Sequence, residues 1–185
     1  MKISAQEKYQ LMLDCYDRLQ ALATDIGKTA VIGDNKALIA ANSFFYECYH
    51  LKDALKKAPF KFGQAVEKHI NSSASLSLAA DICNASKHAG LDGPSRSGKS
   101  VITINTANSI DVPPGTDPGS ITFKRNPSDG DTITVSTSDR VGVPMATTTI
   151  FLTVDGIKHD ALDLAAQCIK DWDAFLQVQG IQFEK

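Results

Sequence analysis

The sequence predicts an α+β fold that is mainly α: a four- to five-helix bundle with a small antiparallel β-sheet inserted before the last helix. Three observations predict it. Apolar residues recur every three to four positions up to about residue 90, as on the buried face of a helix. Short β-branched runs, separated by glycine, proline and serine, then fill residues 100–155. The helical spacing returns after Asp155 and continues towards residue 179.

Each helix has its own start or stop signal. Ser4–Glu7 has the letters of a capping box, and Gly27 follows the first helix. Pro59 stops the second helix, Ser73 can cap the fourth and Asp160 can cap the last. The expected helices lie near residues 5–26, 35–58, 63–70, 73–89 and 160–179.

The β-rich part contains four candidate strands, which are the β-branched runs at 101–104, 121–123, 132–135 and 147–154. The Pro- and Gly-rich stretches 112–119 and 126–130 are typical of loops, and Asp155–Gly156 of a turn. We therefore expect a single domain over residues 1–185. Its helical bundle would comprise 1–92 plus 158–185, with the β-rich insertion at 100–155.

The composition is that of an ordinary globular protein. Apolar residues make up 43% and charged residues 22%, and the formal net charge is −2, so the overall balance does not call for nucleic acid. A local basic patch remains compatible with it. No apolar run has membrane-spanning length. The cysteines lack CxxC spacing, so we expect reduced, buried thiols in a cytoplasmic protein without a metal or cofactor; they are Cys15, Cys48, Cys83 and Cys168.

Two stretches place polar side chains beside apolar positions on helix faces. Asp81, Asn84 and His88 fall at i, i+3 and i+7 of one expected helix, and His50 and Asp53 at i and i+3 of another. If the two helices pack, these groups meet. They would then form either a structural network, because buried polar groups must be hydrogen-bonded, or an acid–base or phosphate-binding site.

The other two histidines are expected to be isolated and exposed; they are His69 and His159. Residues 93–100 read GPSRSGKS and match the letters of a phosphate-binding P-loop. That motif needs a strand before it and a helix after it, whereas here a helix precedes and a strand follows, so we expect a loop and no P-loop. Lys87, Arg96 and Lys99 are still cations near His88 that could reach a phosphate without that geometry.

The stretches 44–53 and 81–88, followed by a closing helix with Trp172 and Phe175, resemble a group of uncharacterised bacterial and phage proteins. That group is itself similar to the HEPN-like helical bundles. The resemblance covers the helices and not the β-rich insertion. It implies a homodimer and a metal-independent RNase of toxin and defence systems, with RNA or a nucleotide as partner. The family's motif is an arginine a few residues before a histidine; His88 matches the histidine, but Asp81 to Lys87 contain no arginine.

Two functions follow from these residues. The first is a HEPN-like nuclease, or a degenerate relative of one, in which His88 is the general acid or base and Asp81 or Asn84 orients it. The second is a non-catalytic ligand-binding or protein-interaction module in which the polar cluster is structural. The candidate catalytic residues are His88, Asn84, Asp81, His50 and Asp53, and the candidate phosphate-binding residues are Lys87, Arg96 and Lys99.

Overall fold

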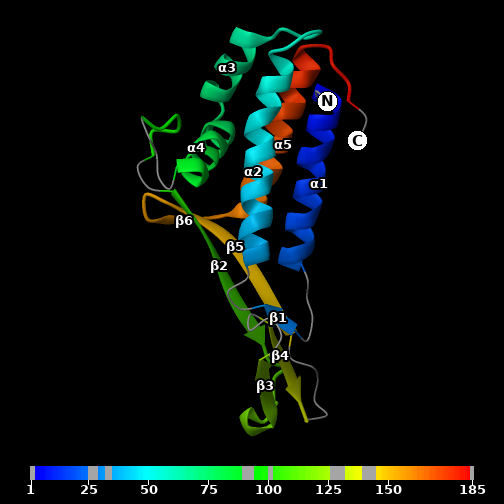
Figure 1. Cartoon of the computed structure of the whole chain (residues 1–185). Coiled ribbons are helices and arrows are strands. Elements are labelled where there is room, and N and C mark those ends of the chain that lie inside the picture. The colour runs from blue at the N-terminus through cyan, green and yellow to red at the C-terminus, as the bar shows by residue number, and fades with distance from the viewer. Residues whose placement is uncertain are drawn as a thin grey trace.

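The protein consists of a helical bundle with a long β-arm at one end (Figure 1). The computed structural model describes residues 3–24, 29–31, 35–88, 94–99, 102–125, 132–138 and 145–183. This part of the chain contains five α-helices: α1 (Ala5–Thr24), α2 (Asn35–Leu55), α3 (Gly63–Ser72), α4 (Ala74–His88) and α5 (Ala161–Val178). The last helix follows the strands. The mainly helical α+β fold is therefore as expected.

The helix ends confirm the capping signals. Ser4 Oγ accepts the amide of Glu7 at 3.1 Å, and the Glu7 carboxylate accepts the amide of Ser4 at 2.7 Å, which is a complete capping box. Ser73 Oγ accepts an amide of the first turn of α4, and the Asp160 carboxylate accepts two amides of the first turn of α5. These side chains satisfy amides that the helix itself leaves unpaired. Gly27 lies outside the described residues.

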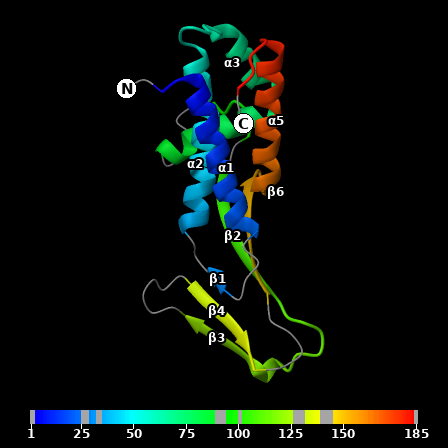
Figure 2. The ribbon, with the colours of Figure 1, turned by 90° about the vertical axis from the view of Figure 1, so that its right-hand side faces the viewer.

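The described strands form two antiparallel three-stranded sheets (Figure 2). One has the order β2-β5-β6 and the other β1-β4-β3. β2 and β5 pair from Ile102↔Val154 to Asp111↔Met145, which makes the ribbon of the arm. Asp155 and Gly156, with φ of 49° and 81°, form the two-residue turn between β5 and β6. The strands are β1 (Thr29–Val31), β2 (Ile102–Asp111), β3 (Ile121–Arg125), β4 (Thr132–Thr137), β5 (Met145–Val154) and β6 (Ile157–Asp160).

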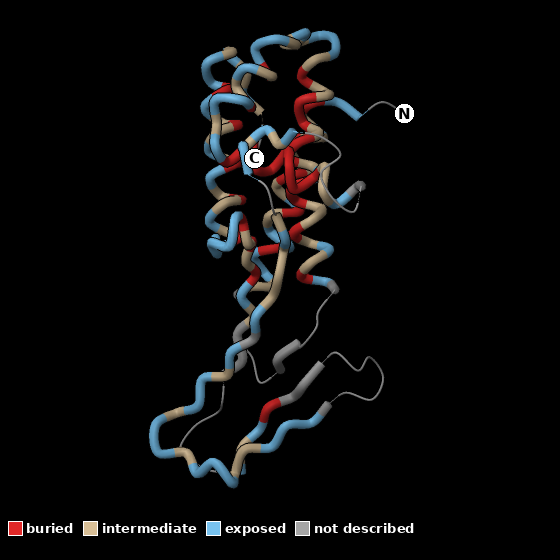
Figure 3. Tube along the Cα trace, turned by 90° about the vertical axis from the view of Figure 1, so that its left-hand side faces the viewer, coloured by how far each residue is buried: buried red, intermediate tan, exposed pale blue. Residues whose placement is uncertain are grey.

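The hydrophobic core lies in the bundle, whereas the described part of the arm is mostly exposed or half-buried (Figure 3). Trp172 of α5 is fully buried and donates its indole N–H to the carbonyl of Cys48 on α2 at 3.1 Å. The arm joins the core at its base through Ile150, Leu152 and Val154 of β5, all buried. All four cysteines are buried free thiols. The bundle therefore supplies a rigid platform to which the β5–β6 hairpin is attached.

Two strands lie outside the expected insertion. β1 is in the expected linker between the first two helices, and it pairs with β4. β6 immediately precedes α5, and all four of its residues are exposed, so it has no apolar–polar alternation to reveal it. The single expected sheet is instead two sheets. The expected loop at 126–130 lies outside the described residues. No helix in the described ranges is long and apolar enough to cross a membrane.

Candidate ligand-binding groove

Asp81 fastens the segment 94–99 to α4. Its carboxylate is almost fully buried, at 1% exposure. One oxygen accepts the main-chain amide of Arg96 at 2.8 Å, and the other accepts the amide and the hydroxyl of Ser97 at 2.8 and 2.6 Å. Hydrogen bonds to an ionised carboxylate are stronger than those between neutral groups, and they offset the cost of burying the charge. The segment with P-loop letters is therefore held in place by a side chain.

The side chain of Arg96 ties the same segment to α3 and α2. Its Nη1 donates to Glu67 at 2.7 Å and to Asn71 at 3.2 Å, and its guanidinium lies 5.5 Å from the centre of the Tyr49 ring. Glu67 also pairs with Lys52 of α2 and with Lys56, which directly follows that helix. Partial burial alone would raise the pKa of Glu67, but the hydrogen bonds from Lys56 and Arg96 and the charge of Lys52 outweigh it and lower the pKa to about 2.

The fastened segment forms one wall of a groove of about 600 Å³. The other walls are the α3–α4 junction, the β5–β6 hairpin and the first turns of α5. The charged residues among those that line the groove are both basic: Arg96 and Lys99. His159 also lines the groove. The apolar part of the lining includes Leu78, Ile157 and Leu164, and Ile157 is 62% exposed. This volume and this mixture of apolar surface with a few polar groups are typical of small-ligand sites.

The positive charge of the groove comes from the loop rather than from the start of α4. Ser73 and Ser75, at that helix end, both donate to the carboxylate of Asp171. The N-terminus of α4 is therefore already paired with an anion, which is the carboxylate of Asp171. Lys99 is paired only weakly: its Nζ lies 3.4 Å from Asp155, and both side chains are substantially exposed. An exposed pair of this kind contributes ~1 kcal/mol or less, so Lys99 can turn to a ligand at little cost.

A second polar pair lies on α2. His50 Nδ1 and Asp53 Oδ2 are 2.7 Å apart, and the His50 ring lies 4.3 Å from the ring of Tyr46, centre to centre. The His50 side chain is 20% exposed and that of Asp53 45%. A carboxylate on one ring nitrogen orients an imidazole and fixes its tautomer, which is how a general base is prepared.

The structure brings the predicted site residues together in part. His50 meets Asp53, Asp81 meets the main chain of Arg96, and Lys99 lines the groove beside Arg96. Asn84 is half-buried on α4. The side chains of Lys87 and His88 lie outside the described residues, so the meeting of all five candidate catalytic residues stays a prediction. The order of α4, segment 94–99 and β2 is the one that argues against a P-loop.

Several groups in this region were missed by the sequence reasoning. His159 is exposed, as expected, but it lies in the groove with Arg96 and Lys99 rather than alone. The expectation for His69 is wrong: it is half-buried, its Nε2 lies 2.8 Å from the carbonyl oxygen of Asp171, and its ring packs 5.0 Å from that of Phe175. The partners of the Arg96 side chain come from two helices, α2 and α3, and no local sequence pattern predicts such contacts. Within the described ranges no group of three or more His, Cys, Asp or Glu side chains could hold a metal ion.

Comparison with known proteins gives no relative for this chain: no family model, no curated protein and no solved structure matches it.

Proposed function

We propose that the protein is a non-catalytic binding module, and that its groove takes a phosphate ester with an apolar body, such as a nucleotide or a nucleotide unit of RNA. The observation that carries the proposal is the charge of the groove lining. Arg96 and Lys99 line it together with apolar side chains such as Leu78, Ile157 and Leu164, and no acidic residue is among the described residues that line it. An anion attached to an apolar body matches both parts of this surface.

The wall of the groove formed by segment 94–99 is preorganised for binding. Both oxygens of the Asp81 carboxylate are engaged with the main chain or hydroxyl of segment 94–99, and the guanidinium of Arg96 is fixed by Glu67. A wall fixed in this way loses little conformational entropy on binding. The role of Asp81 in holding the wall supports the structural reading of the polar cluster over a catalytic one.

The hydrogen bonds within the described structure leave cationic donors for a phosphate. Arg96 uses only Nη1 in its bonds to Glu67 and Asn71, so Nη2 and Nε of the guanidinium have no partner among the described residues. Lys99 is 49% exposed on the same segment. The apolar body of the ligand would lie on Ile157 and Leu164, and His159 would contact its polar edge. Burial of Ile157 would supply part of the binding free energy.

Titration of AMP and of a short oligoadenylate into the intact protein tests this proposal. Lys99→Ala should weaken AMP binding roughly fivefold, which corresponds to about 1 kcal/mol. Lys158→Ala is the matched control, because Lys158 is on the β5–β6 hairpin next to the groove but lies over the Phe151 ring and does not line the groove. Equal losses in both variants, or no AMP binding by the wild type, would refute the proposal. Tighter binding of the oligonucleotide than of AMP would identify RNA as the source of the phosphate.

A HEPN-like ribonuclease is the second candidate, and the pairing of His50 with Asp53 at 2.7 Å favours it. In this reading His50 acts as a general base, together with His88 of α4. His50→Ala should then lower the cleavage rate of a generic RNA substrate ~100-fold or more, and Asp53→Asn should lower it by a smaller factor. RNA that stays intact with the wild-type protein, in the presence of a chelator, would remove this candidate.

A further inference from the structure

A groove of about 440 Å³ lies between α1 and α2, in the half of the bundle nearer the β-arm (Figure 1). Small and aliphatic residues make up most of its lining: α1 contributes Cys15, Ala21 and Leu22, and α2 contributes Ile39 and Ala40. Ile39 is 61% exposed, and Ala21 is exposed too. The groove is therefore an apolar surface that a ligand can reach from solvent, and burial of this surface would favour binding.

The charges at this groove are positive. Its charged lining residues are Arg18 and Lys36, and both are exposed. Asp14, one turn before Arg18 on α1, accepts the side-chain amide of Gln10 at 3.1 Å. Arg18 forms no ion pair with any of the described residues, so its guanidinium can turn to a ligand without breaking one. The groove thus combines an apolar lining with an available cation.

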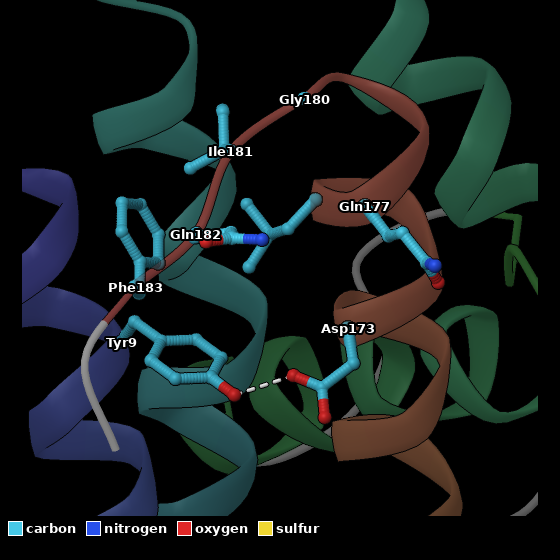
Figure 4. Close-up of a pocket in the computed structure, with 8 residues that line it drawn as sticks. Tyr9, Asp173, Gln177, Gly180, Ile181, Gln182 and Phe183 are labelled. Carbon is cyan, nitrogen blue, oxygen red and sulfur yellow. Dashed lines mark hydrogen bonds between the residues drawn. The ribbon is translucent and has the colours of Figure 1, made fainter.

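The pocket at the end of the bundle away from the β-arm has the opposite charge. There the tail after α5 folds back, and the carboxylate of Asp173 accepts the hydroxyl of Tyr9 (Figure 4). No basic residue is among the described residues that line this tail pocket. An apolar anion would therefore be attracted to the groove between α1 and α2 and repelled from the tail pocket.

We propose that the groove between α1 and α2 binds a long-chain carboxylate of the fatty-acid type, with its hydrocarbon chain on the apolar lining and its carboxylate at Arg18. A guanidinium donates two parallel hydrogen bonds to a carboxylate, a geometry that an alcohol cannot match. A protein partner would need about 800 Å² of surface on each side, whereas a groove of about 440 Å³ has the size of a small-ligand site. The groove shares no lining residue with that of the β5–β6 hairpin, and the inference does not rest on the function proposed there.

Calorimetric titration of the full chain with decanoate, below the concentration at which decanoate forms micelles, tests this inference. The neutral alcohol 1-decanol serves as the reference ligand. Arg18→Gln should weaken binding of decanoate roughly fivefold and leave binding of decanol unchanged, because only decanoate carries a charge. Lys170→Gln removes an exposed cation of α5 outside the groove and should change neither affinity.

Ala21→Phe tests the apolar part of the groove. Ala21 is exposed, so the larger side chain would occupy the groove without disturbing the core, and both ligands should bind roughly tenfold more weakly. Melting temperatures measured without ligand would show that each variant is folded. Four results would overturn the inference: no binding of decanoate by the wild type, equal affinity in wild type and Arg18→Gln, an equal loss in Lys170→Gln, or unchanged binding in Ala21→Phe.

Discussion

The carboxylate of Asp81 accepts the main-chain amide of Arg96 at 2.8 Å, across a separation of 15 residues in the chain. This bond places a loop, rather than another helix, on the polar face of α4. It also fixes the position of the Arg96 main chain, from which the side chain extends to Glu67 on α3. A single buried acid thus joins the helical bundle to the wall of the groove.

Replacement of Asp81 by asparagine should destabilise the protein by about 1–3 kcal/mol, because an amide NH₂ would face a main-chain N–H and leave buried donors unsatisfied. Urea denaturation measures this loss as a lower midpoint. Asp111→Asn, an exposed acid on the arm, is the control and should stay within about 0.5 kcal/mol of the wild type. An unchanged midpoint for Asp81→Asn would mean that the hydrogen bonds from Arg96 and Ser97 to this carboxylate contribute nothing to stability.

Glu67 should make stability depend on pH in the acid range. Its pKa in the folded protein is about 2, below the value of about 4.3 for an unfolded chain. The unfolded state therefore takes up the proton first, and the contribution of Glu67 is fully present above that unfolded pKa and is lost as the pH falls towards about 2. Melting temperatures between pH 6 and 2 should fall less steeply in Glu67→Gln than in the wild type. Parallel curves would contradict the assignment.

The helices and their ends could be predicted because their signals are local. The capping box at Ser4–Glu7 and the caps at Ser73 and Asp160 each act within one turn, and the apolar spacing between them is regular. The turn at Asp155–Gly156 has a local signal too, since its φ values suit those two residue types.

The groove could not be predicted, because it is assembled from segments that are distant in the sequence. Arg96 comes from a loop, Ile157 and His159 from an exposed strand, and Leu164 from the last helix. β1 was missed for a related reason: Thr29–Val31 is too short to show a period, and its pairing with β4 joins residues about a hundred positions apart. Side-chain periodicity reports which face is buried, but not which distant segment covers it.

The cap of the last helix should be worth a measurable part of the stability. Asp160 accepts the amides of Leu162 and Asp163 at 2.7 and 3.1 Å. Asp160→Ala should cost about 0.5–2 kcal/mol, whereas Asp160→Asn should recover most of it, because asparagine is also a good N-cap. Thermal unfolding of the two variants distinguishes them. Equal melting temperatures for alanine and asparagine would argue against a capping role.

A change at Ser97 tests the attachment of segment 94–99 to Asp81 by removing only one of its hydrogen bonds. Ser97→Ala removes the hydroxyl that donates to Asp81 at 2.6 Å and leaves both main-chain amides in place. The variant should lose about 1 kcal/mol of stability and remain folded. Hydrogen exchange of the amides of Arg96 and Ser97 should become faster in it. Unchanged protection of both amides would show that the hydroxyl does not help to hold the segment.

A map of amide chemical shifts during titration with AMP tests the binding proposal most directly. The account predicts that the perturbed amides cluster at residues 96–99, at Ile157 and His159 of the hairpin, and at the α3–α4 junction. The same titration of Lys99→Ala should need roughly fivefold more AMP for the same shifts. Shifts confined to other surfaces, such as the outer face of α2 around His50, or no shifts at millimolar AMP, would contradict the account.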